Sequence, residues 1–395
     1  MKGILRPSCL LTCLAMMTPL QAEQGARFGS PEAVDNRLAQ DQEPDPVPLK
    51  QRLSDQGVNL ALDYSMVAMG ANTSLPGKDN NALSGMLRFY GSWALTGAQS
   101  GNTGSLVWKL EHRHSFTDVP VKFFEFDVGA LGLVTPPFSD EKTRLTNLYW
   151  KQSLRQGKAT VVAGFLDATD YFDVYALASP WSGFLNFAFS TGSTTVALPG
   201  DATLGIAGAT MLGDNWFVIA GVTDMNSDPT EPWKGFDTLF SDGKLFKSIE
   251  LGWTTDQSQI YVNNLHLSYW HADESEQQGT FEGQGINLSA SFQFGPWLPF
   301  LRAGFSEDTG ALTETSISGG VAYFGLGGEA NSLGLGVNWA EIDVGSNQYT
   351  TELYYLMRLT PYFELTPDLQ YIRNPALDPS RSHAWLFGLR GRLFF

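Results

Sequence analysis

The sequence predicts an all-β fold, a 16-stranded antiparallel β-barrel that crosses a membrane. Three observations predict it: the chain begins with a secretory signal, period-two alternation of apolar and polar residues recurs through the rest, and the last residue is the aromatic Phe395. No apolar run after the signal is long enough for a spanning helix. A closed barrel is the other structure that satisfies its backbone inside a bilayer.

Residues 1–22 have the layout of a secretory signal peptide. Two basic residues precede an apolar stretch from Cys9 to Leu20, and a cleavage site follows at Ala22. Lipid attachment at Cys13 is the alternative, but the apolar stretch continues past that cysteine. Both cysteines of the chain lie in the segment to be removed, so we expect no disulfide in the mature protein.

The charge of the chain excludes one class of partner. Removing the signal takes away two basic residues and no acid, which moves the formal net charge from −16 to −18. An acidic surface repels nucleic acid, so we expect no DNA or RNA binding. The same charge argues, more weakly, against a channel dedicated to anions.

A linker is predicted between the signal and the barrel. Residues 23–56 begin with a polar, proline-punctuated stretch that is typical of a periplasmic linker. Near its end, Leu49 and Leu53 lie one turn apart and indicate a short helix. The barrel is predicted over residues 57–395.

Strands are identified by alternation. In "VNLALDYSMVA" (58–68), as in the final "HAWLFGLRGRLFF" (383–395), apolar and polar side chains fall on opposite faces. The candidate strands are 57–69, 85–96, 104–116, 144–154, 158–167, 184–191, 203–212, 215–224, 247–255, 259–271, 282–294, 297–306, 314–325, 331–342, 348–359, 362–373 and 383–395. Single-chain bacterial barrels have an even strand number, so the least regular segment, 184–191, is assigned to an inserted loop.

The parity of a residue, meaning its even or odd position along the strand, also assigns its side chain either to a water-filled interior or to the lipid. The charged residues that it assigns to the interior are Arg88, Lys109, Glu111, Arg113, Arg302, Glu352, Arg358, Glu364, Asp368, Arg390 and Arg392. The aromatic residues predicted at the two membrane interfaces are Tyr149, Trp253, Tyr269, Trp339, Tyr355, Phe363 and Phe395. A soluble sandwich would alternate in the same way, but its core would need more strands that read as uncharged apolar runs.

Several motifs resemble those of the carbohydrate-selective porins, the OprB-like family. "TPYFELTPDLQYIRNPALDPSRSHAWLFGLRGRLFF" (360–395) resembles the end of that family, with its "PDLQY" core, "NP" turn and closing strand. "GFLDATDYFD" (164–173) resembles its strand-to-loop motif, followed by "FLNFAFS" (184–190) and Pro199. The "LSDQGVNLALDY" entry (53–64) also fits, so the resemblance covers nearly the whole mature chain.

The resemblance implies a channel in the outer membrane of a Gram-negative bacterium that passes glucose and other sugars by passive diffusion. It implies that the long third loop folds inward and narrows the pore. It also implies that the terminal Phe395 is read by the machinery that inserts barrels into the outer membrane. The expected partners are small sugars, outer-membrane lipid and lipopolysaccharide. Whether the channel is a monomer or a trimer, and which sugar passes, are left open.

A sugar is neutral, covered in hydroxyls and apolar on its C–H faces, so charged donors and acceptors and an aromatic surface suit it. The family places an Arg–Glu cluster on its early strands, and Arg88, Glu111 and Arg113 match those positions. The predicted pore-lining residues are Arg88, Glu111, Arg113, Trp181, Phe184, Arg358 and Arg390. The alternative is structural: the charges brace one another as ion pairs, and Trp181 packs the loop against the wall.

The sequence predicts no enzyme, no cofactor and no metal. The "HRH" at 112–114 lacks further convergent ligands. Asp167, Asp170 and Asp173 offer three carboxylates that could bind a cation, although a polar strand-to-loop junction explains them as well. The "GLGGEA" at 325–330 links two strands rather than a strand and a helix, which excludes a dinucleotide site.

Two other functions remain as alternatives. The first is a general diffusion porin without sugar selectivity. The second is a barrel enzyme such as a protease or lipase, which would require a serine or acid posed with a histidine at the strand tips, and no such pair is evident in the sequence.

Overall fold

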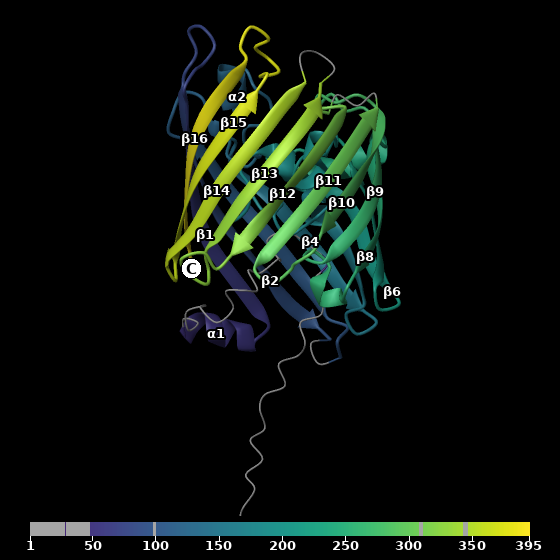
Figure 1. Cartoon of the computed structure of the whole chain (residues 1–395). Coiled ribbons are helices and arrows are strands. Elements are labelled where there is room, and N and C mark those ends of the chain that lie inside the picture. Colours follow the sequence, from purple (N-terminus) through teal and green to yellow (C-terminus); the bar gives the residue numbers. More distant parts are fainter. Residues whose placement is uncertain (1–27, 29–47, 98–99, 308–310, 343–346) are drawn as a thin grey trace, which may run out of the picture.

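The structure, a computed structural model, describes residues 28, 48–97, 100–307, 311–342 and 347–395. Sixteen antiparallel strands close into one barrel in which each strand pairs with its neighbours in sequence and β1 pairs with β16 (Figure 1). The predicted fold class is therefore confirmed. The predicted signal peptide and most of the predicted linker lie outside the described residues.

The strands follow the predicted segments closely. Their bounds are β1 Val58–Ala71, β2 Asn81–Thr96, β3 Gly104–Ser115, β4 Lys142–Leu154, β5 Ala159–Leu166, β6 Thr203–Leu212, β7 Trp216–Asp224, β8 Leu245–Thr254, β9 Asn264–Ala272, β10 Gly283–Ser291, β11 Trp297–Glu307, β12 Thr315–Phe324, β13 Ser332–Glu341, β14 Gln348–Thr360, β15 Phe363–Arg373 and β16 His383–Phe394. The start of β9 differs most from its prediction. Gln257–Gln259 forms a 3-10 helix, η8, and Ile260 and Tyr261 after it are buried.

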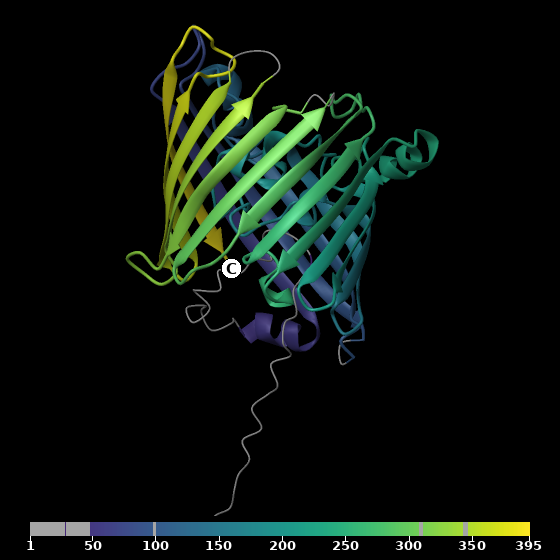
Figure 2. The same ribbon diagram turned by 45° about the vertical axis from the view of Figure 1, so that its right-hand side comes forward.

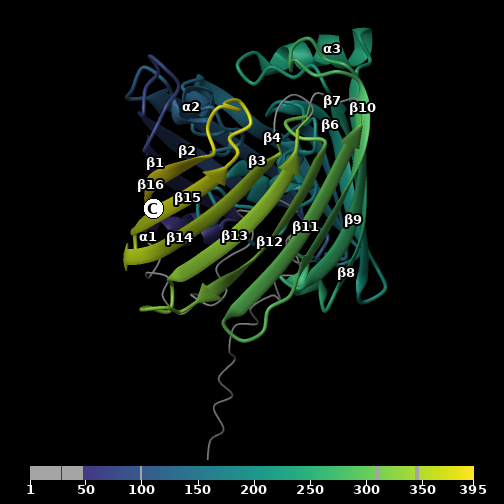
Figure 3. The same cartoon turned by 45° about the horizontal axis from the view of Figure 1, so that its top comes forward.

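The helices are short. Their bounds are α1 Pro48–Asp55, η3 Val121–Phe123, α2 Phe124–Val128, η4 Ala168–Asp170, η5 Phe187–Phe189, η6 Thr191–Thr194, η7 Pro232–Lys234, α3 Gly235–Ser241 and η8 Gln257–Gln259. Among the described residues, no helix is long and apolar enough to cross a membrane. α1 lies below the barrel, at the end where the chain also finishes, while α2 and α3 lie at the opposite end (Figures 1 and 3).

Side chains alternate between the inside and the outside of the barrel. On β9, the outward Leu265, Leu267 and Tyr269 are exposed, whereas the inward His266 and Ser268 are buried. The other strands show the same division, so the outer surface carries an apolar band and the inner surface carries the polar side chains. The charged residues that parity assigns to the interior lie on the inward faces of their strands.

One predicted interface residue lies on the opposite face. Parity predicts that Tyr149 faces outward, but it faces the interior and lines a cavity together with Asn147. The register between β3 and β4 shifts between Lys109 and Leu110, and the consecutive residues Thr146 and Asn147 are both buried. A bulge of this kind reverses the alternation beyond it. The other predicted interface aromatics lie on outward positions.

The longest connection, residues 167–202 between β5 and β6, folds into the barrel and is named the inward segment below. Seen toward the end that carries α2 and α3, blue and teal segments are visible inside the ring of strands (Figure 3). The inward segment packs its apolar side chains on the inner walls, with Phe172 and Val174 in one cluster and Phe184 and Phe189 in another. Phe28, the one described residue before α1, is buried in the first of these clusters.

Glycines on the inner wall make room for the inward segment. A Cβ on Gly336 of β13 would lie 2.7 Å from Phe189 Cε1 and 3.1 Å from Phe184 Cε1. The rings of Phe184 and Phe189, with centroids 4.6 Å apart, therefore lie directly against the backbone of β13. A larger residue at Gly336 would push them away from the wall.

Gly336→Val is expected to loosen the inward segment without preventing barrel formation. Overpacking of this kind lowers the free energy of unfolding by about 1–3 kcal/mol. Urea titration in lipid vesicles measures this, and limited proteolysis reports on the segment. The control is Gly319→Val, because a Cβ on Gly319 would have its nearest neighbour at 3.6 Å. Equal stability and equal protease resistance of the two variants would contradict this packing.

Candidate functional site

The inward segment is held in the lumen by buried polar side chains of the wall, and the first anchor is Asp173. Its carboxylate forms an ion pair with Arg302 of β11 and a 3.0 Å contact with His266 Nε2 of β9, and it accepts a 2.7 Å hydrogen bond from the backbone N–H of Gly192. The backbone N–H of Asp173 donates to Glu250 of β8 at 2.9 Å. One residue of the segment thus contacts three strands.

Burial by itself raises the pKa of the Asp173 carboxyl, but the Arg302 guanidinium and His266 outweigh burial and hold the pKa below its ordinary value. The carboxylate is therefore ionised in the folded protein. Arg302 also donates to Ser193 Oγ at 2.9 Å, and its guanidinium lies 4.2 Å from the centre of the Tyr175 ring. These contacts tie both halves of the inward segment to β11.

The second anchor is Glu352 of β14. Its two carboxylate oxygens accept hydrogen bonds from the backbone N–H groups of Leu185 and Asn186, at 2.6 and 2.9 Å. The Asn186 side chain donates to Gln370 of β15 at 3.0 Å. Arg390 of β16 donates to two backbone carbonyls of the inward segment, Pro180 O at 2.7 Å and Gly183 O at 3.0 Å.

The third anchor joins the segment to β1 and β2. Arg88 of β2 forms an ion pair with Asp63 of β1, and Arg392 of β16 donates to the same carboxylate at 2.8 Å. The Trp181 ring covers Arg88, with the guanidinium carbon 3.8 Å from the ring centre, and Trp181 also packs on Phe138 of the 116–141 loop. Arg88 is 0% exposed as a result.

A separate charge network lies where the 116–141 loop meets the end of the inward segment. Arg113 donates to Glu111 at 2.8 Å, to Asp201 at 2.9 Å and to Glu141 at 3.4 Å. Arg144 of β4 forms ion pairs with Glu141 and, at 3.1 Å, with Asp201. These five residues are named the rim network below.

Two carboxylates of the rim network are more exposed than its guanidinium groups. The side chains of Glu141 and Asp201 are 33% and 22% exposed, whereas those of Arg113 and Arg144 are 4% and 8% exposed. Lys122, itself partly exposed, donates to Glu141 at 2.9 Å. The network therefore presents carboxylates to solvent and keeps its guanidinium groups behind them.

Both exposed carboxylates stay charged at neutral pH. Burial raises the pKa of Glu141, but Lys122, Arg144 and Arg113 outweigh it and lower the pKa to about 2. Burial likewise opposes ionisation of Asp201, and Arg113 and Arg144 outweigh it, so its pKa lies below the ordinary value.

Asp167, at the start of the inward segment, shows the opposite shift. Burial, and then the negative charges of Asp170 and Asp201, raise its pKa to about 7. Its carboxylate accepts hydrogen bonds from the backbone and side chain of Thr169, at 2.9 and 2.6 Å. Asp170 turns instead toward Lys109 of β3, at 3.5 Å. Asp173 belongs to the Arg302 anchor, so the three carboxylates of "DATDYFD" do not converge on one point.

Near the end of the barrel that faces α1, a second group of charges is partly exposed. Arg358 of β14 donates to Glu364 of β15 at 2.9 Å, and the side chains of Arg358 and Arg392 are 16% and 18% exposed. Their guanidinium carbons lie 5.2 and 5.3 Å from the centre of the Phe394 ring. This arrangement combines hydrogen-bond donors with an aromatic face.

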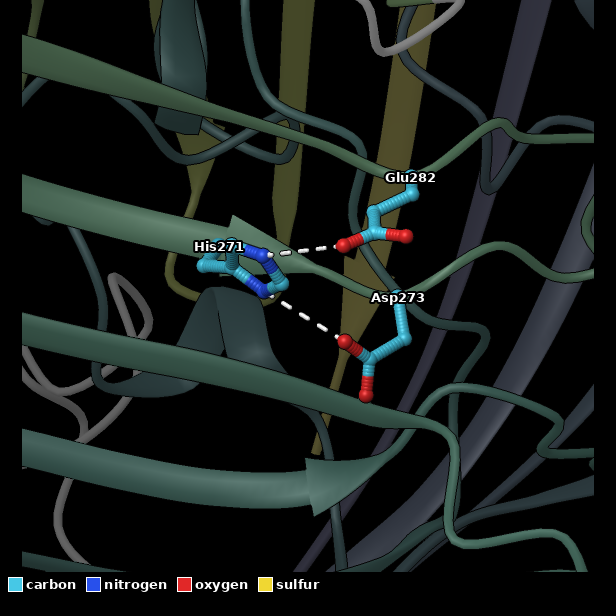
Figure 4. A group of neighbouring side chains, drawn as sticks. All are labelled: His271, Asp273 and Glu282. Carbon is cyan, nitrogen blue, oxygen red and sulfur yellow. Dashed lines mark ion pairs between the residues drawn. The ribbon is translucent and has the colours of Figure 1, made fainter.

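One group with metal-ligand chemistry lies on the outer surface of the barrel. His271, Asp273 and Glu282 place one ligand atom each within 4.8 Å of one another, at the junction of β9, the 273–282 loop and β10 (Figure 4). Lys247 Nζ lies 3.2 Å from Asp273 Oδ1. An ammonium group thus already occupies a position from which a cation would bind that carboxylate.

The predicted pore-lining residues separate into three places. Glu111 and Arg113 belong to the rim network, and Arg358 lies near the α1 end. The remaining four, Arg88, Trp181, Phe184 and Arg390, are at most 5% exposed and hold the inward segment to the wall. Their assignment as sugar contacts stays a prediction. Phe184 packs edge-on against Tyr354 with a centroid distance of 4.9 Å, among other aromatic rings.

Alternation in the sequence does not identify Glu141, Arg144 and Asp201 as members of a site. Glu141 and Asp201 lie in connections between strands, where parity assigns no face. Arg144 is the third residue of β4 and precedes the bulge, so its segment gives a weak alternation signal. Alternation over residues 58–68 places Asp63 on the polar face of β1, but no sequence feature pairs it with Arg88.

Comparison with known proteins gives a family and a fold. The sequence model of the carbohydrate-selective porin, OprB family, matches residues 123–294 and 286–395. No curated protein gives a significant match. The high-pH structure of Pseudomonas putida OprB superposes with a TM-score of 0.68 at 14% identity and covers 88% of this chain and 96% of that one.

Two further solved structures are similar at lower scores. The low-pH structure of Pseudomonas putida OprB has a TM-score of 0.53 at 14% identity, with 88% and 95% of the two chains covered. A triple mutant of Rhodopseudomonas blastica porin has a TM-score of 0.53 at 12% identity, with 86% and 100% covered. At such identities the structural likeness supports the fold alone.

Asp173→Asn is expected to lower the free energy of unfolding by about 3–5 kcal/mol, because it leaves Arg302 buried without its counter-charge. Urea unfolding in lipid vesicles measures the change. Asp79→Asn, at an exposed position between β1 and β2, serves as the matched control and should stay within about 0.5 kcal/mol of the unsubstituted protein. An unchanged unfolding midpoint for Asp173→Asn would show that this anchor contributes little.

Proposed function

The chain belongs to the OprB family of carbohydrate-selective porins, and on this basis we propose that its rim network is the sugar-selecting constriction. The protein is a sugar-selective channel of the bacterial outer membrane. In our proposal, a sugar exchanges its hydration water for hydrogen bonds to the network and then passes on by diffusion. Arg358 and Arg392 would offer a second set of contacts near the α1 end.

The observation that carries the proposal is the charge network itself. Glu141 and Asp201 are partly exposed and ionised, and each is held by at least two cationic side chains. An ionised carboxylate accepts hydrogen bonds from neighbouring sugar hydroxyls at little cost in reorganisation, because Arg113 and Arg144 already fix its position. The guanidinium groups also offset the negative charge, which suits a neutral solute.

Aromatic contacts for the apolar sugar face are proposed at Tyr90 and Phe394. Both are partly exposed on the inward faces of β2 and β16. The predicted aromatic surface, Trp181 and Phe184, has its ring faces covered by protein. We propose that these two residues act indirectly, by holding the inward segment in place.

Membership of a porin family identifies a channel, and we propose that the chain carries no enzymatic activity. The histidines of "HRH" support this view. His112 Nδ1 lies 2.8 Å from Thr143 Oγ1 and His114 Nε2 lies 2.9 Å from the Tyr64 hydroxyl, on the outward side of the barrel. A general diffusion porin stays the alternative among channels, and its distinguishing property is a current that glucose reduces without saturation.

Asp201→Asn is expected to raise the glucose concentration that half-blocks the single-channel current by about tenfold. A charge-assisted hydrogen bond contributes about 1.5 kcal/mol, and this corresponds to roughly a tenfold change in affinity. Losing one negative charge should also move the ion preference toward anions. Planar-bilayer recordings with graded glucose measure both effects.

The control is Asp140→Asn, at the exposed residue directly before Glu141. It should leave the half-blocking concentration unchanged. If Asp201→Asn behaves like this control while glucose still blocks the unsubstituted channel saturably, the constriction lies elsewhere. If glucose reduces the current of the unsubstituted channel without saturation, the protein is a general diffusion porin.

The raised pKa of Asp167 predicts a pH dependence of ion selectivity. As pH rises through about 7, this carboxyl loses its proton beside Asp170 and Asp201, so cation preference should increase. Because folding raises the pKa of Asp167, its protonated carboxyl contributes to the stability of the fold. This contribution is complete below the ordinary carboxyl pKa and is lost as pH rises through about 7.

Reversal potentials across a salt gradient at several pH values measure this selectivity. Asp167→Asn should remove the step near pH 7, because an asparagine side chain does not titrate. A step of the same size in Asp167→Asn would assign the titration to another group.

A further inference from the structure

The 225–244 loop between β7 and β8 folds outward over the barrel wall, unlike the inward segment. In Figure 2 its teal helix, α3, projects beyond the ring of strands at the end opposite α1. Gly235 is buried against the wall, where an added Cβ would lie 3.2 Å from Leu204 Cβ. Leu239 packs against the cluster that contains Phe165 and Leu204, which are outward residues of β5 and β6.

α3 is fixed to the wall at a second point. Thr238 Oγ1 donates a hydrogen bond to the Asp224 carboxylate at the end of β7. At the start of the loop, the backbone N–H and the side chain of Thr230 donate to Asp228, both within 3 Å. The outward position of the helix is therefore built by specific contacts.

Three large aromatic side chains of this loop are nevertheless exposed. Trp233, Phe236 and Phe240 are 65%, 47% and 79% exposed. Trp233 and Phe236 pack edge-on against Phe165, with centroid distances of 5.3 and 5.8 Å. Their spacing of three and four residues places all three on one side of the helical turn. Lys234 and Asp237, also exposed, interleave with them.

The exposed aromatics continue an apolar surface that already faces lipid. On the neighbouring strands the outward side chains of Ile206, Val222, Ile249 and Leu251 are between 42% and 53% exposed. These belong to the band by which the barrel contacts the membrane. Phe165, at the end of β5, joins this band to the rings of α3.

We propose that Trp233, Phe236 and Phe240 form a lipid anchor that inserts into the outer leaflet beside the barrel. Aromatic side chains are favoured at the boundary between head groups and acyl chains, and a short helix with an apolar face and charged flanks lies in that boundary. The anchor holds the 225–244 loop on the membrane surface, away from the mouth of the lumen.

The exposed area favours lipid over a second copy of the chain. An aromatic side chain buries at most about 250 Å², so three partly exposed rings offer roughly 400 Å². A stable protein interface needs about 800 Å² from each partner. A lipid leaflet has no such requirement, because each exposed ring gains from burial independently.

The test places a fluorescent probe on single cysteines in a chain that starts at residue 23, because the only two cysteines of the sequence, Cys9 and Cys13, precede that residue. Phe240→Cys reports on the proposed anchor. Leu251→Cys in the lipid-facing band and Ser241→Cys, the exposed residue next to Phe240, serve as positive and negative controls. The labelled barrels are inserted into phosphatidylcholine vesicles that contain nitroxide-labelled acyl chains, which quench only probes close to them.

The proposal expects a loss of fluorescence at Phe240→Cys comparable to that at Leu251→Cys, and clearly greater than at Ser241→Cys. Quenching no greater than at Ser241→Cys overturns it. So does energy transfer between donor- and acceptor-labelled Phe240→Cys chains that persists when the lipid-to-protein ratio is raised, because a second copy would then cover the helix. If Phe240→Cys fails the heat-shift assay for a folded barrel, Trp233→Cys replaces it.

Discussion

The pairing of Asp173 with Arg302 is the interaction on which the arrangement of the lumen depends. A barrel of sixteen strands encloses more space than its own side chains fill, so its inner face would be wet. Here the inward segment covers that face and buries Arg302, Glu352 and Arg390. Buried charged and polar groups are tolerated only when they are paired or hydrogen-bonded, and the segment supplies the partners through Asp173 and through its backbone groups.

This division explains why some lumen charges face water and others do not. On the wall of β8 to β16, the buried side chains that hold the segment are Glu250, Arg302, Glu352 and Arg390. The opposite side, where Glu111 and Arg113 of β3 meet Glu141 and Asp201, keeps two carboxylates partly exposed. In our proposal, selection of a neutral solute takes place where the segment stops covering the wall, and the anchors determine that place.

The strands could be predicted from the sequence because alternation has a single period of two residues. The lipid outside the barrel and the water inside it also differ strongly in polarity, so the two faces of each strand carry clearly different side chains. The same logic failed at Tyr149, since the bulge at Thr146 and Asn147 is a backbone irregularity that composition does not reveal. Alternation also gives no information on Asp201 and Glu141, whose positions depend on how two loops fold against each other. The identity of the anchors, such as Glu352 with the Leu185 and Asn186 amides, depends on contacts between residues far apart in sequence.

The most direct test of the account measures single-channel conductance and glucose block in the double variant Asp173→Asn/Glu352→Gln. If the anchors set the constriction, freeing the segment should raise small-ion conductance and remove saturable block by glucose, while the heat-shift assay still reports a folded barrel. A folded double variant with the conductance and half-blocking glucose concentration of the unsubstituted channel would contradict the account, because the constriction would then not depend on the docked segment.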